Sequence, residues 1–287
     1  MAPALFAAPS SIYTKGIGTV SFPKEMAFGE RCRLARKHGF GAVEIRCVTD
    51  IAIPHTAVQC AEWKRAAASE GVQMATLWAS GPLYADGVMH DPDPARRQKG
   101  RDALARAIEA AAALGVDSIL VNAVRVGIGA KLMHRYEDVY QRFQEGLQSL
   151  VPVCAKHNVR LLVENVGNRF LLSPMEMRAF IDGVRSDWVQ VYFDVGNVLL
   201  QGYPQDWIPT LGKRIRRIHF KDFKFDTNYA GHFVELGEGD LDWKATMAEI
   251  RAIGYRGYIV DEWTAGADFE QRLARSSKAI DRILALS

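Results

Sequence analysis

The segment Ile218-His219-Phe220-Lys221-Asp222 ends a short apolar stretch in charged residues. Polar and apolar residues alternate before it, from Arg214 to Ile218, which indicates a strand. A histidine followed at once by a lysine and an aspartate is typical of a barrel strand that presents catalytic side chains at its carboxyl end. A histidine that only fills the core is the alternative explanation of this segment taken alone.

Three other apolar segments end in an acidic residue in the same way. Residues 159–165 contain Glu164, residues 189–197 contain Asp194, and residues 258–260 run into Asp261 and Glu262. One charge at one strand end carries little information. Its repetition in four successive strands of the second half of the chain predicts a functional site.

Short apolar strands alternate with helical segments along the whole chain, as in a parallel sheet buried on both faces. The expected strands are residues 16–22, 41–48, 72–78, 116–123, 159–164, 189–194, 214–219 and 258–262. No GxGxxG motif follows the first strand, which argues against a doubly wound dinucleotide-binding sheet. Eight repeats predict an α/β protein with a (β/α)8 TIM barrel as a single domain. Residues 1–15 are expected to form a loose N-terminal tail and residues 16–287 the barrel.

The composition excludes several classes of function. The 287 residues are 48% hydrophobic and 24% charged, with 36 basic and 33 acidic residues and a net charge of +3. This balance argues against a nucleic-acid partner or an anionic membrane surface. No run is long enough for a membrane span, and residues 1–9 lack the basic region of a signal peptide. The four cysteines form no CxxC pair, which predicts reduced, mostly buried thiols in a cytoplasmic protein.

Closure of the barrel would bring the four strand-end residues Glu164, Asp194, His219 and Glu262 together at one mouth. Three carboxylates and an imidazole in one pocket repel each other unless a cation lies between them. Oxygen-rich ligands with one histidine suit one divalent ion such as Mn²⁺, Mg²⁺ or Co²⁺ better than a structural zinc. Helix caps and surface ion pairs are the alternative explanation for these charges.

Five motifs together resemble the xylose-isomerase-like sugar phosphate isomerase/epimerase superfamily, and most of all its ketose and xylulose 5-phosphate 3-epimerases. They are Leu162-Val163-Glu164-Asn165, Phe193-Asp194-Val195-Gly196-Asn197, His219-Phe220-Lys221-Asp222, Gly237-Glu238-Gly239-Asp240 and Tyr258-Ile259-Val260-Asp261-Glu262-Trp263. The resemblance implies that the four strand-end residues bind one divalent metal, usually Mn²⁺. It also implies that Glu164 and Glu262 act as catalytic acid and base on opposite faces of a sugar.

This chemistry needs those residue types. A metal that binds the ketone oxygen and a neighbouring hydroxyl stabilises the enediolate formed when a carbon-bound proton is removed. One glutamate would remove the proton and the other would return it, giving epimerisation or isomerisation of a keto-sugar. A sugar dehydratase or keto-glycoside lyase with the same site, and a non-catalytic sugar-binding barrel, are the alternatives. An apurinic-site endonuclease is disfavoured, because that family uses three metals and more histidines than the seven found here.

The expected substrate contacts follow from the same strand ends. The resemblance places Asn197 where the ketose 3-epimerases have a substrate-binding histidine, and Phe170 where they have a second acid. Asn197 in this motif is more similar to the phosphopentulose epimerases. Lys221 together with Lys224 would hold a phosphate or carboxylate, unless Lys221 is only the countercharge of Asp222.

Three further residues at the ends of the second, third and fourth strands are candidates for contact with the sugar. Glu44 is expected to bind a sugar hydroxyl or to pair with Arg46. Trp78 and Asn122 are expected to line the sugar pocket, and a place in the core is the alternative for Trp78. Residues 223–240 are expected to form a long irregular loop that acts as a mobile lid. The sequence leaves open whether the chain forms a homo-oligomer.

Overall fold

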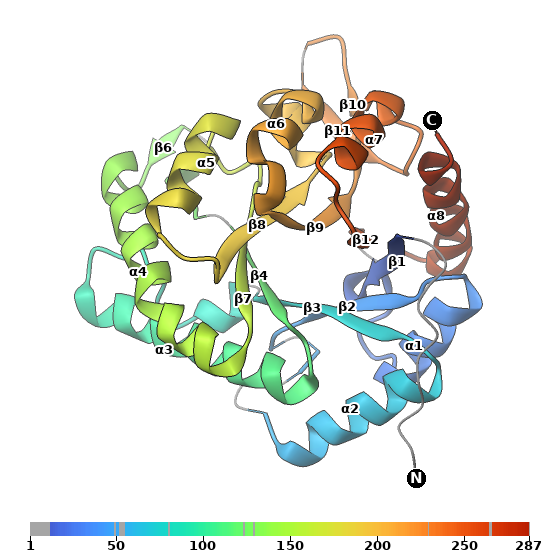
Figure 1. Cartoon of the computed structure of the whole chain (residues 1–287), viewed down its shortest axis with the longest axis horizontal. Helices are drawn as coiled ribbons and strands as arrows, with labels where there is room; N and C mark the ends of the chain where they lie inside the picture. The colour runs from blue at the N-terminus through green and yellow to red at the C-terminus, as the bar shows by residue number, and fades with distance from the viewer. Residues whose placement is uncertain are drawn as a thin grey trace.

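A closed barrel of eight parallel strands forms the centre of the molecule (Figure 1). The computed structural model describes residues 12–48, 50–51, 55–79, 81–122, 124–128, 130–228, 230–263 and 266–286. Around the barrel the strands follow the order β1 (Tyr13–Gly18), β12 (Gly257–Asp261), β9 (Ile215–Phe220), β8 (Val189–Asp194), β7 (Arg160–Glu164), β4 (Ser118–Asn122), β3 (Gln73–Ala79) and β2 (Ala42–Arg46). The predicted (β/α)8 barrel is therefore confirmed.

Helices connect the strands and surround the barrel as an outer ring (Figure 1). They are α1 (Phe28–Lys37), α2 (Ala57–Ser69), α3 (Pro94–Leu114), α4 (Tyr136–His157), α5 (Pro174–Gly183), α6 (Pro204–Leu211), α7 (Trp243–Ala252) and α8 (Phe269–Leu284). The N-termini of α3 and α5 show why these helices begin where they do. The side chains of Asp93 and Ser173 accept hydrogen bonds from Ala95 and Glu176, and a proline occupies the first turn of each helix.

The first strand begins earlier than expected. β1 starts at Tyr13 and ends at Gly18, and residues Thr19–Ser21 form a short 3₁₀ helix instead of the end of a strand. The cause is pairing with the last strand, in which Tyr13 lies opposite Gly257 and Ile17 opposite Asp261. Residues 13–15 therefore belong to the barrel, and the remainder of the expected tail, up to residue 11, lies outside the described residues.

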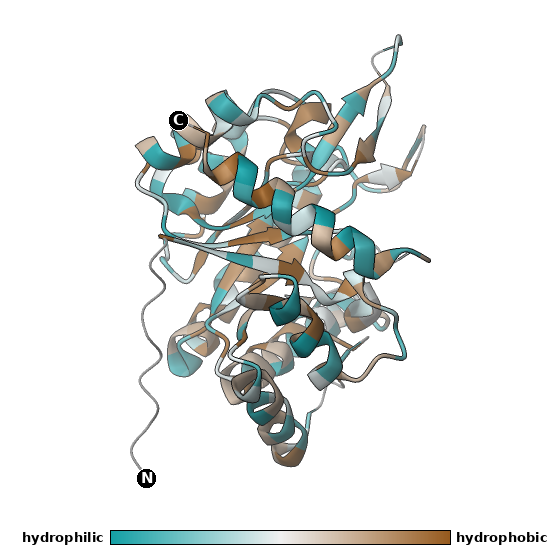
Figure 2. Cartoon of the chain, turned by 90° about the vertical axis from the view of Figure 1, so that its right-hand side faces the viewer, coloured by the Kyte–Doolittle hydropathy of each residue, from teal (hydrophilic) through white to brown (hydrophobic). Residues whose placement is uncertain are grey.

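The expectation of an irregular loop at residues 223–240 is wrong for the part that forms two strands. β10 (Asp222–Phe225) and β11 (Gly231–Val234) pair as an antiparallel hairpin. The rings of Phe223 and Phe233 meet edge to face with centroids 5.3 Å apart, a contact that favours pairing. The hairpin projects beyond the body of the barrel (Figure 2). A second small hairpin joins β5 (Gly127–Ile128) to β6 (Lys131–Leu132).

The barrel interior is layered, with an apolar middle between two polar ends. Leu120, Leu162 and Tyr192 are fully buried and pack together in the middle, apart from the core between the strands and the helices. Since side chains two residues apart on a strand share a face, the next residues toward the carboxyl ends point inward as well. That upper layer holds the residues of the predicted site. The lower layer holds Ser118, Arg160, Gln190 and Arg217.

Outside the barrel interior, one continuous apolar core joins the strands to the helices. All four cysteines are free and buried, as expected. Among the described residues, no helix combines the length and the apolar character that crossing a membrane requires.

Candidate metal centre and active site

The four predicted ligands meet at the carboxyl ends of four neighbouring strands. Glu164 and Asp194 are the last residues of β7 and β8, His219 lies near the end of β9, and Glu262 directly follows β12. One ligand atom from each of the four side chains lies within 4.8 Å of every other. Residues separated by up to 98 positions in the chain are neighbours because the strands pair in parallel around the barrel.

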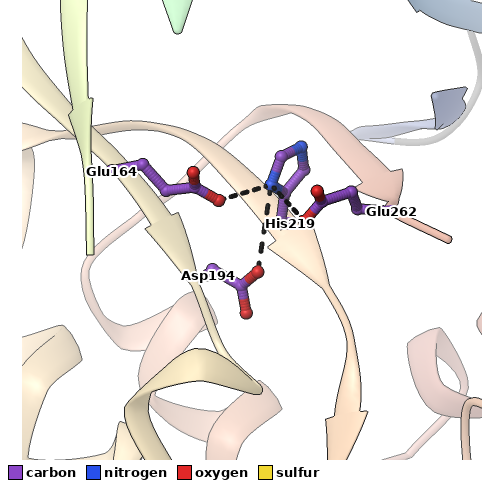
Figure 3. Close-up of side chains that lie close together, drawn as sticks. All are labelled: Glu164, Asp194, His219 and Glu262. Carbon is purple, nitrogen blue, oxygen red and sulfur yellow. Dashed lines mark hydrogen bonds and ion pairs between the residues drawn. The ribbon is translucent and has the colours of Figure 1, made fainter. Parts of the chain in front are cut away.

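Three carboxylates converge on the same ring nitrogen of His219 (Figure 3). The distances from Nδ1 are 3.0 Å to Glu164 Oε1, 3.6 Å to Glu262 Oε2 and 3.9 Å to Asp194 Oδ2. The Glu164, Asp194 and His219 side chains are at most 2% exposed, whereas that of Glu262 is 17% exposed. Glu262 is therefore the member of the cluster that faces the open mouth.

The other ring nitrogen of His219 binds Glu44. The distance from Nε2 to Glu44 Oε1 is 3.0 Å, and both side chains are 1% exposed. Glu44 was expected to bind a sugar hydroxyl or to pair with Arg46; its partner is His219 instead of Arg46, and its contact with a substrate stays a prediction. A carboxylate on the second nitrogen of a histidine fixes the orientation and tautomer of a metal ligand. The only sequence signal for this role is that Glu44 is an acid at an inward position of a buried strand.

Glu164 is held from its other side by Asn122. The Asn122 side-chain amide donates to Glu164 Oε2, and Trp78 Nε1 donates to Asn122 Oδ1 at 2.7 Å. The polar groups of Trp78 and Asn122, both expected to contact the sugar, thus orient Glu164. Their contact with a substrate stays a prediction.

Lys221 supplies positive charge to the cluster. One alternative in the sequence, that Lys221 is only the countercharge of Asp222, is wrong. Its Nζ donates to Glu262 Oε2 and lies 3.2 Å from Asp194 Oδ2. Nζ also lies 4.9 Å from the centre of the Phe233 ring on β11, so the hairpin contacts the site through this lysine.

Asp222 instead anchors the segment that follows the hairpin. Its Oδ2 accepts hydrogen bonds from the backbone of Gly237 at 2.8 Å and Gly239 at 3.2 Å, and from Trp243 Nε1 at 3.0 Å. A Cβ on Gly239 would lie 2.1 Å from Asp222 Oδ1, so no larger residue fits there without movement. The glycines of this segment therefore allow a buried carboxylate to bind its backbone.

Asp194 is placed by its own loop and by the neighbouring strand. The backbone amides of Gly196 and Asn197 donate to its Oδ1, both at 2.8 Å. The Asn165 side chain binds the backbone of Asp194 twice: its Oδ1 accepts from the Asp194 amide at 2.9 Å, and its Nδ2 donates to the Asp194 carbonyl at 2.8 Å. The Asn197 side chain donates to the Asn165 carbonyl at 3.1 Å, and its contact with a substrate stays a prediction.

Burial and charge move the pKa values of the two glutamates apart. Burial raises the pKa of Glu164 to about 7, although His219 opposes the change. Burial also tends to raise the pKa of Glu262, but the charges of Lys221 and His219 outweigh it and hold the value below its usual range. Two carboxyl groups with opposed environments are typical of an acid and base pair.

The donor set fits one divalent cation. The Oδ2 atom of Asp194 is fully buried, and no described group donates a well-directed hydrogen bond to it, which leaves a carboxylate oxygen available as a ligand. Three carboxylate oxygens and one imidazole nitrogen suit Mn²⁺ or Mg²⁺. Lys221 alone cannot balance three carboxylates, so a cation among them would remove their repulsion.

Comparison with known proteins agrees with this geometry. The model of the family described as "Xylose isomerase-like TIM barrel" matches residues 32–284. The chain belongs to the xylose isomerase-like TIM barrel family. The family resemblance drawn from the five sequence motifs is therefore confirmed.

Within this family, the chain is 29% identical over 261 residues to the protein named "Putative L-ribulose-5-phosphate 3-epimerase SgbU" of Escherichia coli (strain K12). That match covers 88% of this chain and 89% of SgbU. An inosose dehydratase of Salmonella typhimurium (strain LT2) is 25% identical over 140 residues, which is 43% of this chain and 46% of the dehydratase. A structure of D-psicose 3-epimerase in the presence of D-fructose superposes with a TM-score of 0.78 at 20% identity, covering 94% of this chain and 99% of the other, which shows the shared fold.

Proposed function

We propose that this protein is a metal-dependent sugar isomerase or epimerase that moves a proton next to the ketone of a keto-sugar. The convergence of Glu164, Asp194, His219 and Glu262 within one ligand sphere at the barrel mouth carries the proposal. The match to SgbU over most of both chains supports epimerisation as the reaction and places ketose phosphates among the substrates to test. Mn²⁺ is the proposed metal, since oxygen ligands with one imidazole suit it.

The metal would be held by the four side chains and would supply a Lewis acid that stabilises negative charge on the substrate oxygens once the carbon-bound proton is removed. Glu164 and Glu262 would exchange protons with the substrate carbon from two sides. Glu164 is held by Asn122 and His219, so its carboxyl group is fixed before substrate arrives. Glu262 is more exposed and paired with Lys221, which keeps it ionised and able to accept a proton.

Lys221 and the hairpin would complete the mouth. Lys221 lies between two carboxylates of the cluster and the ring of Phe233, where an anionic or hydroxylated part of the substrate would meet a cation. A ketose phosphate or a sugar acid is therefore the proposed substrate class beside neutral ketoses. Asn197, Trp78 and Asn122 are proposed as further contacts at the same mouth.

Elimination is the second candidate. A relative over part of the chain is an inosose dehydratase, and an inosose is a keto-polyol. Loss of water can follow the same deprotonation next to a ketone. In that case one glutamate would remove the carbon-bound proton and the other would protonate the leaving hydroxyl.

Solvent deuterium incorporation separates these outcomes. The protein is incubated with Mn²⁺ in D₂O and a panel of ketoses, ketose phosphates and inososes, and the products are followed by NMR. Deuterium at C3 with inverted configuration is expected for an epimerase, deuterium at C1 or C2 of an aldose–ketose pair for an isomerase, and loss of water for a dehydratase. Metal binding without deuterium entry into any keto-sugar would contradict the proposal and favour a sugar-binding barrel.

A further inference from the structure

A basic cavity opens at the end of the barrel opposite the metal centre. Its volume is about 470 Å³. Its lining comes from the amino ends of strands, among them Ser118 on β4, Arg160 on β7 and Arg217 on β9, and from the turns that precede β9 and β12. A barrel strand of five residues is roughly 16 Å long, so this cavity lies well outside the reach of the proposed catalytic residues. The apolar layer of Leu120, Leu162 and Tyr192 separates the two.

Positive charge dominates the lining. Five basic side chains and one acid contribute to it; the acid is Asp117 and the bases are Arg160, Lys213, Arg216, Arg217 and Arg256. Asp117 is paired with Arg217, which also donates to the Ala75 carbonyl at 3.4 Å. Asp117 is thus taken by Arg217, and none of the other four basic side chains forms an ion pair with a described carboxylate. A concave surface with walls of one sign concentrates ions of the opposite sign.

Two buried polar atoms point to a ligand in this cavity and not to charge alone. Ser118 is 2% exposed, and its Oγ makes no hydrogen bond with any described group. The Nε atom of Arg160 is also buried and without such a partner, while the guanidinium lies over the Trp188 ring at 5.2 Å. Ser118 and Arg160 lie opposite each other on the paired strands β4 and β7. Buried polar atoms normally have partners, so two unpaired donors on these neighbouring residues indicate a missing acceptor.

We propose that this cavity is a binding site for a small phosphate-bearing anion, separate from the active site. Both unpaired groups can donate, and an acceptor that takes a hydroxyl and a guanidinium at once is an oxyanion. Arginine is suited to phosphate because its planar group presents several donors in a fixed arrangement. Lys213, Arg216 and Arg256 are exposed at the entrance and would add charge as the anion enters. The ligand is either free phosphate or the phosphate group of a small metabolite.

Calorimetric titration of the full-length protein with inorganic phosphate tests the site, with chloride at matched ionic strength as the reference. Saturable binding with phosphate and none with chloride is expected. Ser118→Ala removes a hydroxyl but no charge, and is expected to weaken phosphate binding about tenfold through the lost hydrogen bond to a charged group. Ser118→Thr keeps the hydroxyl and should bind within a few-fold of the wild type. A titration with glycerol 3-phosphate separates the two ligand sources, since tighter binding than inorganic phosphate indicates a phosphorylated metabolite.

Charge variants complete the design. Arg216→Gln and Lys213→Gln are exposed substitutions at the entrance and should each weaken phosphate binding several-fold. Arg36→Gln removes the same charge from an exposed position on α1, a helix that contributes no residue to the lining, and should leave binding unchanged. The proposal is overturned if phosphate binds no better than chloride, if Ser118→Ala binds like the wild type, or if Arg36→Gln weakens binding as much as Arg216→Gln. The first two outcomes would mean an adventitious ion only, and the third would mean attraction by diffuse charge.

Discussion

Glu44 Oε1 lies 3.0 Å from His219 Nε2, on the side of the imidazole that points away from the cluster of carboxylates. The ring is thereby held between Glu44 and Glu164, which lies 3.0 Å from Nδ1. A histidine bound on one nitrogen by a buried carboxylate can present only the other nitrogen to a metal. This relationship makes Glu44 a positioning residue for the proposed metal centre.

Glu44→Gln is expected to weaken Mn²⁺ binding by about 10- to 100-fold, the range for loss of a group that orients a metal ligand. The measurement is calorimetric titration of metal-free protein. Glu145→Gln, at an exposed position of α4, is the matched control and should bind Mn²⁺ like the wild type. Equal affinities for the wild type and Glu44→Gln would show that Glu44 does not orient the ligand.

Removal of the metal is expected to lower the melting temperature, because an ion that binds only the folded state stabilises it. At a free Mn²⁺ concentration a hundredfold above Kd, the gain in free energy of unfolding is about 2.7 kcal/mol. Differential scanning fluorimetry with Mn²⁺ and with EDTA measures the change. His219→Ala should abolish it, and a shift of the same size in that variant would place the metal elsewhere.

Lys221→Met is expected to increase the stabilisation that Mn²⁺ provides. The lysine is the positive group nearest to Asp194 and Glu262 in the metal-free protein, so its loss increases the repulsion among the buried carboxylates until a cation binds. The rise in melting temperature on adding Mn²⁺ should exceed that of the wild type. Lys224→Met, at an exposed position of β10, is the control. An unchanged or smaller rise in Lys221→Met would contradict the countercharge role.

Glu164→Gln and Glu262→Gln are each expected to lower turnover by roughly 10² to 10⁴-fold, the usual contribution of a general acid or base. The amide keeps the size of the side chain but cannot accept the proton. The rate of deuterium entry into the substrate, measured with saturating Mn²⁺, is the readout. Near wild-type rates in both variants would leave the glutamates as ligands only.

His90 makes the stability of the fold depend on pH. Burial lowers its pKa to about 4, with a further contribution from His134. The unfolded chain, with a pKa near 6.5, binds a proton more readily, so the contribution of neutral His90 is complete above about pH 6.5 and is lost as the pH falls toward 4. The loss is at most about 3 kcal/mol. Urea unfolding at pH 7 and pH 4.5 should show a smaller pH effect in His90→Gln than in the wild type, and no such reduction in His232→Gln at an exposed position of β11.

The sequence by itself determined the barrel and the identity of the four proposed ligands. Buried parallel strands leave continuous apolar runs, and a parallel barrel brings all their carboxyl ends to one mouth, so position along each run was enough to predict Glu164, Asp194, His219 and Glu262. The caps of α3 and α5 are local in the same sense, because capping depends on residues within one turn.

Only the tertiary structure decided which side chains meet around those ligands. Glu44 and His219 are 175 positions apart, and Lys221 and Glu262 are 41 apart. No local pattern records these contacts, since they depend on strand register and on how far each side chain reaches across the barrel. The pairing of β10 with β11 is local, and it was missed because each strand has only four residues, too short a run for its pattern to stand out. The binding of Asp222 to Gly237 and Gly239 was missed because it depends on how the segment after the hairpin folds back. The basic cavity at the far end has no signal in the sequence, because its charges come from strand starts that are separate in the chain and become neighbours only when the barrel closes.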